Sequence, residues 1–163
     1  MHTALFIGRF QPFHNAHLAD IKKILGENDF VVIAIGSSQH HSTRENPFSY
    51  SERKKMIELA LKAGRIKNFR IFPVPDMYND RLWVEYITYR LPHFDVVYSG
   101  NAWTLKCFRK FGYKNKKIKL LKGISSTIVR DHITREKEWK KLVPGEIHNF
   151  IKKIKGEERI RFA

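Results

Sequence analysis

Short apolar runs alternate with segments of helical periodicity through the first hundred residues, and this alternation constrains the fold more than any other feature. The runs cover residues 3–7, 30–35, 69–74 and 94–98, and glycine follows three of them, at Gly8, Gly36 and Gly100. Between the runs, apolar residues recur every three or four positions. Strands that alternate with helices form a parallel sheet with right-handed crossovers. The sequence therefore predicts a doubly wound α/β fold in one domain, residues 1–163.

Helix boundaries follow from the same pass along the chain. Ser49 and Glu52 form a possible capping box before a helix that ends near Gly64. We expect further helices at residues 82–91, from Ser126 or Thr127 to residue 132, and at residues 144–154, the last being a small C-terminal helical part. A short basic strand is expected near residues 118–121.

The charge of the chain limits its partners. Lys and Arg number 31 against 16 Asp and Glu, which leaves a formal net charge of +15. Such a charge attracts nucleic acids, nucleotides or acidic membranes, although a solvated basic face has the same composition. Cys107 stands alone, and the first residues lack a basic leader. These features predict a cytoplasmic protein without disulfides, signal peptide or membrane span.

The loop after the first run reads GRFQPFHNAHL and holds two histidines, His14 and His17. Three residues apart at the start of a helix, both rings reach the same volume, where they donate hydrogen bonds to a phosphate beside the unpaired N–H groups of the helix. Zinc ligation is the alternative, but Asp20 is the one carboxylate within reach, so no metal ligands are predicted among the side chains. The remaining alternative is that both are ordinary core or surface histidines without a role in binding.

A second segment, ISSTIVR at residues 124–130, offers another phosphate site. Small hydroxyl residues that open a helix donate to phosphate, and an arginine one turn later adds a bidentate contact. Simple N-capping is the competing explanation. The residues concerned are Ser125, Ser126, Thr127 and Arg130.

GRFQPFHNAHL resembles the phosphate-binding signature of the H-x-G-H nucleotidyltransferase superfamily, and its GRFQPFH form is similar to the archaeal-type nicotinamide-nucleotide adenylyltransferases. IGSSQHH, ENPFSYSER, LWVEY, FDVVYSGN and ISSTIVR extend the resemblance over nearly the whole chain. The resemblance implies a Rossmann-like nucleotidylyltransferase fold. It also implies direct in-line transfer of an adenylyl group from ATP to nicotinamide mononucleotide, giving NAD⁺ and pyrophosphate. Mg²⁺ would be held mainly by the phosphates.

Site residues follow from the resemblance position by position. Catalysis by alignment and cationic stabilisation is expected of His14, His17 and Arg130. ATP binding is expected of Gly8, Arg9, Phe10, His14, His17, Gly100, Asn101, Ser125, Ser126, Thr127 and Arg130. Acceptor binding is expected of Phe13, Gly36, Ser37, Asp80 and Trp83, the last as an aromatic platform for the nicotinamide ring.

Alternatives stay open for several of these residues. Asn101 fits a helix cap, and Trp83 fits the core of an amphipathic helix. The sequence departs from the family pattern at Ala16, usually glycine, and at Asp80, often asparagine; a carboxylate cannot donate as an amide does. These departures leave the amide or acid form of the mononucleotide open as the acceptor.

Other functions also remain open. The acceptor could instead be pantetheine phosphate, FMN, or a sugar or polyol phosphate, with CTP as another donor. A basic nucleic-acid-binding module on the same fold is the alternative from a different class, although no nucleic acid is the expected partner. Relatives of the archaeal type form homo-oligomers, often hexamers, so a homo-oligomer is expected.

Overall fold

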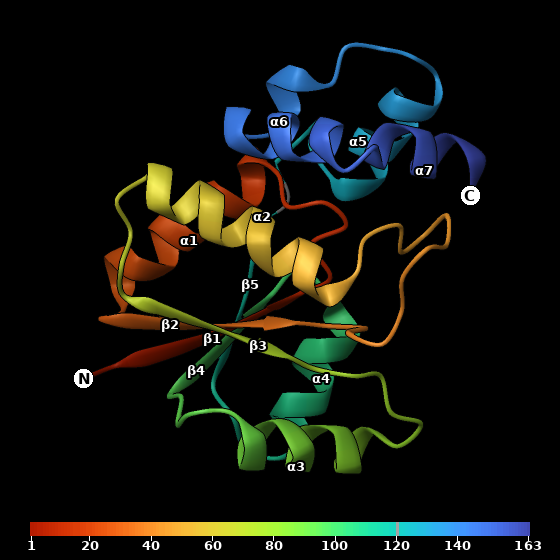
Figure 1. Ribbon diagram of the computed structural model, residues 1–163. Helices are drawn as coiled ribbons and strands as arrows, with labels where there is room; N and C mark the ends of the chain where they lie inside the picture. The colour runs from red at the N-terminus through yellow and green to blue at the C-terminus, as the bar shows by residue number, and fades with distance from the viewer. Residues whose placement is uncertain (120) are drawn as a thin grey trace. The chain divides into compact units, whose positions relative to one another are not determined.

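The computed structural model describes residues 1–119 and 121–163 of the chain (Figure 1). Its elements follow in the order β1 (Thr3–Gly8), α1 (Asn15–Glu27), β2 (Phe30–Ile35), α2 (Tyr50–Ala63), β3 (Phe69–Pro73), α3 (Asp80–Arg90), β4 (Val96–Ser99), α4 (Ala102–Lys110), β5 (Asn115–Lys117), α5 (Ser126–Thr134), the 3₁₀ turn η1 (Lys140–Leu142), α6 (Gly145–Lys153) and α7 (Gly156–Phe162). None of the described helices is long and apolar enough to cross a membrane.

The chain divides into two compact units. Unit 1 contains residues 1–9, 20–38 and 68–119, and unit 2 contains residues 10–19, 39–67 and 120–163. The chain passes from the first unit to the second in the loop after β1, and it passes back within α1. That residues 1–163 act as a single domain stays a prediction.

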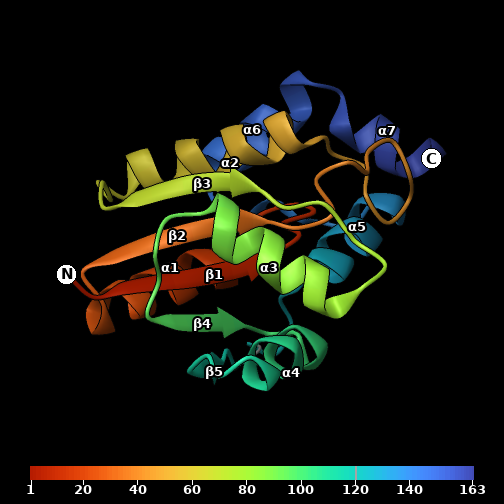
Figure 2. The ribbon, with the colours of Figure 1, turned by 90° about the horizontal axis from the view of Figure 1, so that it is seen from below.

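Unit 1 is built on a five-stranded parallel sheet. The strands lie in the order β3-β2-β1-β4-β5, which Figure 2 shows side by side. Ala4 of β1 pairs with Val31 of β2 on one side and with Val96 of β4 on the other. Every residue of β2 after Phe30 is buried, as expected for a strand covered on both faces. Helices α3 and α4 lie on one side of this sheet, and α1 lies on the other (Figure 1).

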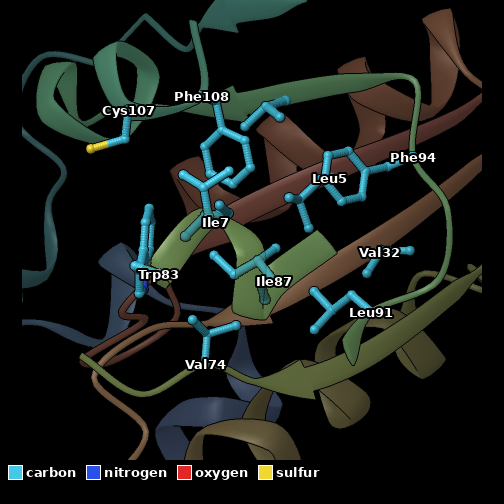
Figure 3. Packing of buried hydrophobic residues seen from close by; sticks show 13 residues of the cluster. Leu5, Ile7, Val32, Val74, Trp83, Ile87, Leu91, Phe94, Cys107 and Phe108 are labelled. Carbon is cyan, nitrogen blue, oxygen red and sulfur yellow. The ribbon is translucent and has the colours of Figure 1, made fainter. Parts of the chain in front are cut away.

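The core of unit 1 follows from the alternation of side chains along the strands. Leu5, Ile7 and Val32 belong to one cluster with residues of α3 and α4, including Ile87 and Phe108 (Figure 3). The residues between them in the strands point to the opposite face, where Phe6, Val31 and Ile33 are buried. Ile21 and Ile24 of α1, in the same unit, are buried as well. Apolar burial on both faces therefore stabilises the sheet.

Unit 2 is helical. Its helix α2 begins with a complete capping box, because the side chain of Ser49 accepts from the Glu52 N–H at 3.2 Å and the Glu52 carboxylate accepts from the Ser49 N–H at 2.9 Å. Helix α2 packs against α6, and α5 packs against α7. Arg159 of α7 donates to both Glu52 oxygens, at 2.7 and 2.9 Å, so the first turn of α2 is tied to the last helix.

The sequence-based predictions of fold class, of four strands and of the capping box are confirmed. The fifth strand was placed too late: β5 is Asn115–Lys117, and Ile118 and Lys119 follow it outside the strand, although the Ile118 N–H still donates to the Ser99 carbonyl at 3.0 Å. Leu120, inside the expected range, lies outside the described residues. The expected cap of α5 was also wrong, because Ser125 and not Ser126 or Thr127 takes that position. Helix α7 was not anticipated, and α4 was expected only under the alternative in which Asn101 caps a helix.

Candidate active site

The loop after β1 contains a backbone conformation that residues other than glycine rarely adopt. Phe10 has a φ of 53°, in the left-handed region, and its ring is only 1% exposed. That ring contacts Phe13, with centroids 5.8 Å apart, and His17, with centroids 4.8 Å apart in a T-shaped arrangement. Burial and ring contacts therefore offset the strain of the backbone at this position.

Gln11 anchors the next residue of the loop. Its buried side-chain amide donates to the Phe48 carbonyl at 2.9 Å and accepts from the Phe48 N–H at 3.0 Å. Both polar ends of the amide and both backbone groups of Phe48 are thereby satisfied, which a buried amide requires. The loop is consequently fixed to the segment that precedes α2.

His14 and His17 form two reciprocal hydrogen bonds at the start of α1. Nδ1 of His17 accepts from the His14 N–H at 3.2 Å, and Nδ1 of His14 accepts from the His17 N–H at 3.3 Å. The two rings are stacked, with centroids 3.6 Å apart and planes inclined by 17°. The predicted convergence of these two rings is therefore present, with their orientation set by the backbone.

This arrangement fixes where the ring protons lie. A nitrogen that accepts a hydrogen bond carries no proton, so each neutral ring carries its proton on Nε2. Burial lowers the pKa of His14 from 6.5 to about 4. Burial, followed by the charge of His14, lowers the pKa of His17 well below 6.5. Both rings are neutral donors at pH 7, so the positive charge expected of them must come from another group.

Helix α5 supplies that charge beside the same loop. Nη1 of Arg130 donates to the Gln11 carbonyl at 2.7 Å, and Oγ of Ser126 donates to the Pro12 carbonyl at 2.8 Å. Ser125 caps the helix by accepting from the Ile128 N–H at 3.1 Å. The capping explanation thus holds for Ser125, whereas Ser126 and Arg130 bind the loop backbone. Unit 2 brings together six of the predicted site residues: Phe10, Phe13, His14, His17, Ser126 and Arg130.

In unit 1, further predicted site residues lie at the carboxyl ends of the strands. The Gly36 N–H donates to the Gly8 carbonyl at 2.8 Å, which joins the ends of β2 and β1. Ser37 follows with a φ of 47°, and its hydroxyl donates to Oδ1 of Asp76 at 3.0 Å. Asp76 was missed by the sequence analysis, although its position just after β3, at the same edge of the sheet, was a usable signal.

After the end of β4, Asn101 caps α4, which was one of the two explanations for this residue in the sequence. Its Oδ1 accepts from the N–H groups of Trp103 and Thr104 at 2.9 and 3.2 Å. The hydroxyl of Ser99, the residue before Gly100, accepts from the Asn101 N–H at 3.1 Å. The side-chain oxygen of Asn101 is therefore used within the helix.

Two further predicted acceptor residues of unit 1, Asp80 and Trp83, lie on α3. Trp83 is 5% exposed and belongs to the core cluster of the unit (Figure 3). Its indole contacts the ring of Phe108 edge-on, with centroids 5.7 Å apart, and the ring of Trp103, with centroids 5.0 Å apart. Asp80, exposed at the start of the helix, accepts a hydrogen bond from Cys107. Burial, with the charge and hydrogen bond of Asp80, raises the pKa of the Cys107 thiol.

Carboxylates near the loop do not assemble into a metal site. Burial raises the pKa of Asp20 from 3.8 to about 6, against the opposing charge of Lys23. Within residues 1–119 and 121–163, no three His, Cys, Asp or Glu side chains come together in a group that could hold a metal ion.

The parallel sheet, the paired imidazoles and Arg130 of α5 place the chain in the class of α/β nucleotidyltransferases. A family model described as cytidylyltransferase-like matches residues 5–144. A nicotinamide-nucleotide adenylyltransferase of Methanococcus aeolicus is 41% identical over 160 residues, which is 97% of this chain and 92% of that protein. One of Thermococcus onnurineus is 39% identical over 160 residues, with 96% and 86% covered. The chain belongs to the cytidylyltransferase-like family and, within it, to the nicotinamide-nucleotide adenylyltransferases, which confirms the resemblance drawn from the motifs.

A solved structure bears on the fold. The bifunctional NMN adenylyltransferase/ADP ribose pyrophosphatase of Francisella tularensis, in complex with AMP and manganese, has a TM-score of 0.81 and 24% identity to this chain. The match covers 98% of this chain and 52% of that protein, so this chain spans about half of that bifunctional protein's length. The likeness confirms the Rossmann-like nucleotidyltransferase fold.

Proposed function

We propose that the chain transfers the adenylyl group of ATP to nicotinamide mononucleotide, giving NAD⁺ and pyrophosphate. A phosphate oxygen of the acceptor attacks the α-phosphorus of ATP in line. The new P–O bond forms as the bond from the α-phosphorus to the bridging oxygen breaks, and pyrophosphate leaves with the electron pair. No protein nucleophile takes part. The relatives' names support the reaction, and the reciprocal His14–His17 pair is the observation that carries it.

The two histidines orient the triphosphate as neutral donors. With both Nδ1 atoms engaged by backbone N–H groups, both Nε2–H groups donate from stacked rings to neighbouring phosphate oxygens. Donors held in place before the reaction stabilise charge that develops on the transferring phosphoryl oxygens. Arg130, fixed on the Gln11 carbonyl, adds the positive charge that the neutral rings lack.

A divalent cation, Mg²⁺ in our proposal, accompanies ATP and neutralises charge on its phosphates. The donor set of the described residues fits a cation held by phosphate oxygens and water more than by side chains, as Mg²⁺ often is. Gly8, Arg9, Phe10, Gly100, Asn101, Ser125, Ser126 and Thr127 complete the proposed ATP site.

The acceptor site is proposed at Phe13, Gly36, Ser37, Asp80 and Trp83. Trp83 offers an indole plane to a flat, electron-poor ring. We further propose a cytoplasmic homo-oligomer, on the strength of one buried cysteine without a disulfide partner and of the archaeal family pattern.

A direct assay tests the reaction. Purified protein receives ATP, Mg²⁺ and one acceptor at a time: nicotinamide mononucleotide, its acid counterpart, pantetheine phosphate or FMN. We expect pyrophosphate release with the mononucleotides and formation of the matching dinucleotide. If pyrophosphate is released with another acceptor and with neither mononucleotide, that acceptor, and not nicotinamide mononucleotide, is the substrate.

Variants of the histidines test the role of the pair. His14→Ala and His17→Ala should each lower kcat by about 100-fold or more, the usual effect of losing one preorganised donor. His41→Ala, which removes an exposed histidine bonded to Ser42, serves as the matched control and should keep full activity. Full activity in both active-site variants would refute the proposed phosphate clamp.

A further inference from the structure

Trp83 presents little ring surface to a ligand in this structure, although it is the proposed platform for the acceptor. The side chain is 5% exposed and sits in the core cluster of unit 1 (Figure 3). Phe108 holds its ring edge-on, with an interplanar angle of 67°. A flat heterocycle needs an open aromatic face to stack on, so a residue that covers Trp83 controls access to it.

Trp103 is that residue. It is the second residue of α4, and its ring lies against Trp83 with centroids 5.0 Å apart and planes inclined by 38°. An aromatic ring inserted between two others needs about 7 Å between them, twice the contact distance of carbon atoms. The observed spacing therefore leaves no room for a third ring between the two indoles.

The two tryptophans differ in their freedom to move. Trp83 is packed among core residues on α3, so displacing it would open a cavity. Trp103 is 46% exposed, and Asn101 fixes its backbone N–H but not its ring. Rotation of an exposed side chain about χ1 costs little compared with repacking a core.

We propose that Trp103 is a specificity-determining residue that covers Trp83 in the free protein and turns away when the ring of the acceptor stacks on Trp83. The acceptor must break the contact between the two indoles before it binds. Rings that stack on indole strongly, such as a cationic pyridinium, offset that loss better than weakly stacking groups. The proposal rests on the proposed function, since it takes Trp83 as the acceptor platform.

Removing the cover should strengthen acceptor binding. With Trp103→Ala, the Kd of nicotinamide mononucleotide, measured calorimetrically on the full chain, should fall about three- to tenfold, the range expected for an aromatic pair. Trp103→Phe should give an intermediate value. Phe111→Ala is the matched control: Phe111 is 40% exposed at the other end of α4, and its loss should leave the Kd unchanged.

Fluorescence reports the movement itself. In a Trp139→Phe background, Trp83 and Trp103 are the only tryptophans, and selective excitation of tryptophan reports on these two. Adding nicotinamide mononucleotide should quench the emission of Trp83 by stacking. The remaining emission, from Trp103, should then be quenched more strongly by iodide, because that ring becomes more exposed. Unchanged iodide quenching upon saturation would overturn the movement of Trp103.

The Kd series separates the two proposals. An unchanged or higher Kd in Trp103→Ala, together with normal pyrophosphate release by the wild type, overturns the cover and leaves the reaction standing. Tighter binding of the mononucleotide in Trp103→Ala without any pyrophosphate release supports the cover and refutes the reaction. Absence of mononucleotide binding by both proteins refutes the acceptor and the cover together.

Discussion

Two histidines with lowered pKa values make the stability of the protein depend on pH. The folded state holds His14 neutral down to a pKa of about 4, whereas an unfolded chain protonates it near 6.5. Between these values the unfolded state binds more protons, so stability falls as the pH decreases. Burial of His17 lowers its pKa in the same direction.

This linkage predicts the behaviour of His14→Gln. Because the variant lacks the titrating ring, it should lose less stability than the wild type between pH 6.5 and pH 4. The difference should reach about 3 kcal/mol at the acid end. Asp20, with a pKa raised to about 6, acts in the opposite sense in both proteins and cancels from the difference. Urea unfolding at several pH values measures it. His41→Gln should keep the wild-type slope; an equal flattening there would rule His14 out as the cause.

At the residue scale, the sequence located the histidine pair but not its bonding. The i, i+3 spacing put both rings on one face of a helix that had a visible start. The reciprocal bonds use the backbone N–H groups of both histidines, after a loop in which Phe10 has a positive φ, and no spacing rule predicts this backbone geometry. Asp76 and Trp103 escaped notice because their partners, Ser37 and Trp83, lie far away in the sequence.

Elements with strong local signals were predicted well. The runs of β-branched residues located β1 and β2 to within a residue, and the capping box located the start of α2. Strand β5 has only three residues and two of them are lysines, so its position depends on pairing with β4 and not on its own composition. Helix α7 has seven residues and no side-chain cap, which explains why the sequence did not reveal it.

The packing of α7 makes a prediction at the element scale. A Cβ added at Gly156 would lie 2.8 Å from Cγ2 of Ile151 and from Cε1 of Phe48. Gly156→Ala should therefore destabilise the protein by about 1–3 kcal/mol, as overpacking does. Gly145, at the start of α6, has nothing within 4 Å of such an atom, so Gly145→Ala is the control. Thermal unfolding compares them, and equal midpoints would contradict the close packing of α7.

For the whole molecule, the net charge of +15 is unevenly distributed. Residues 96–130 contain nine Lys and Arg residues and no Asp or Glu. Charge of one sign raises the association rate of anionic ligands through long-range attraction, which salt screens. This composition suits a nucleotide substrate, and it also left the nucleic-acid alternative open.

Salt dependence distinguishes these uses of the charge. Raising the salt from about 0.05 to about 0.5 M should lower kcat/KM for ATP several-fold, and lower that for the less charged mononucleotide to a smaller extent. Initial rates with each substrate varied in turn measure it. Tight, steeply salt-dependent binding to DNA that persists in the His14→Ala, His17→Ala double variant would instead support the nucleic-acid alternative.

The bonds from Ser126 and Arg130 to the carbonyls of Pro12 and Gln11 have an electrostatic consequence for any anion that reaches the loop. Each of these oxygens carries partial negative charge that would repel a polyphosphate. Because the hydroxyl already donates to one of these oxygens and the guanidinium to the other, that repulsion is reduced before a nucleotide arrives. Helix α5 thus improves the affinity of the loop for phosphate in addition to the contacts that its residues are proposed to make with ATP.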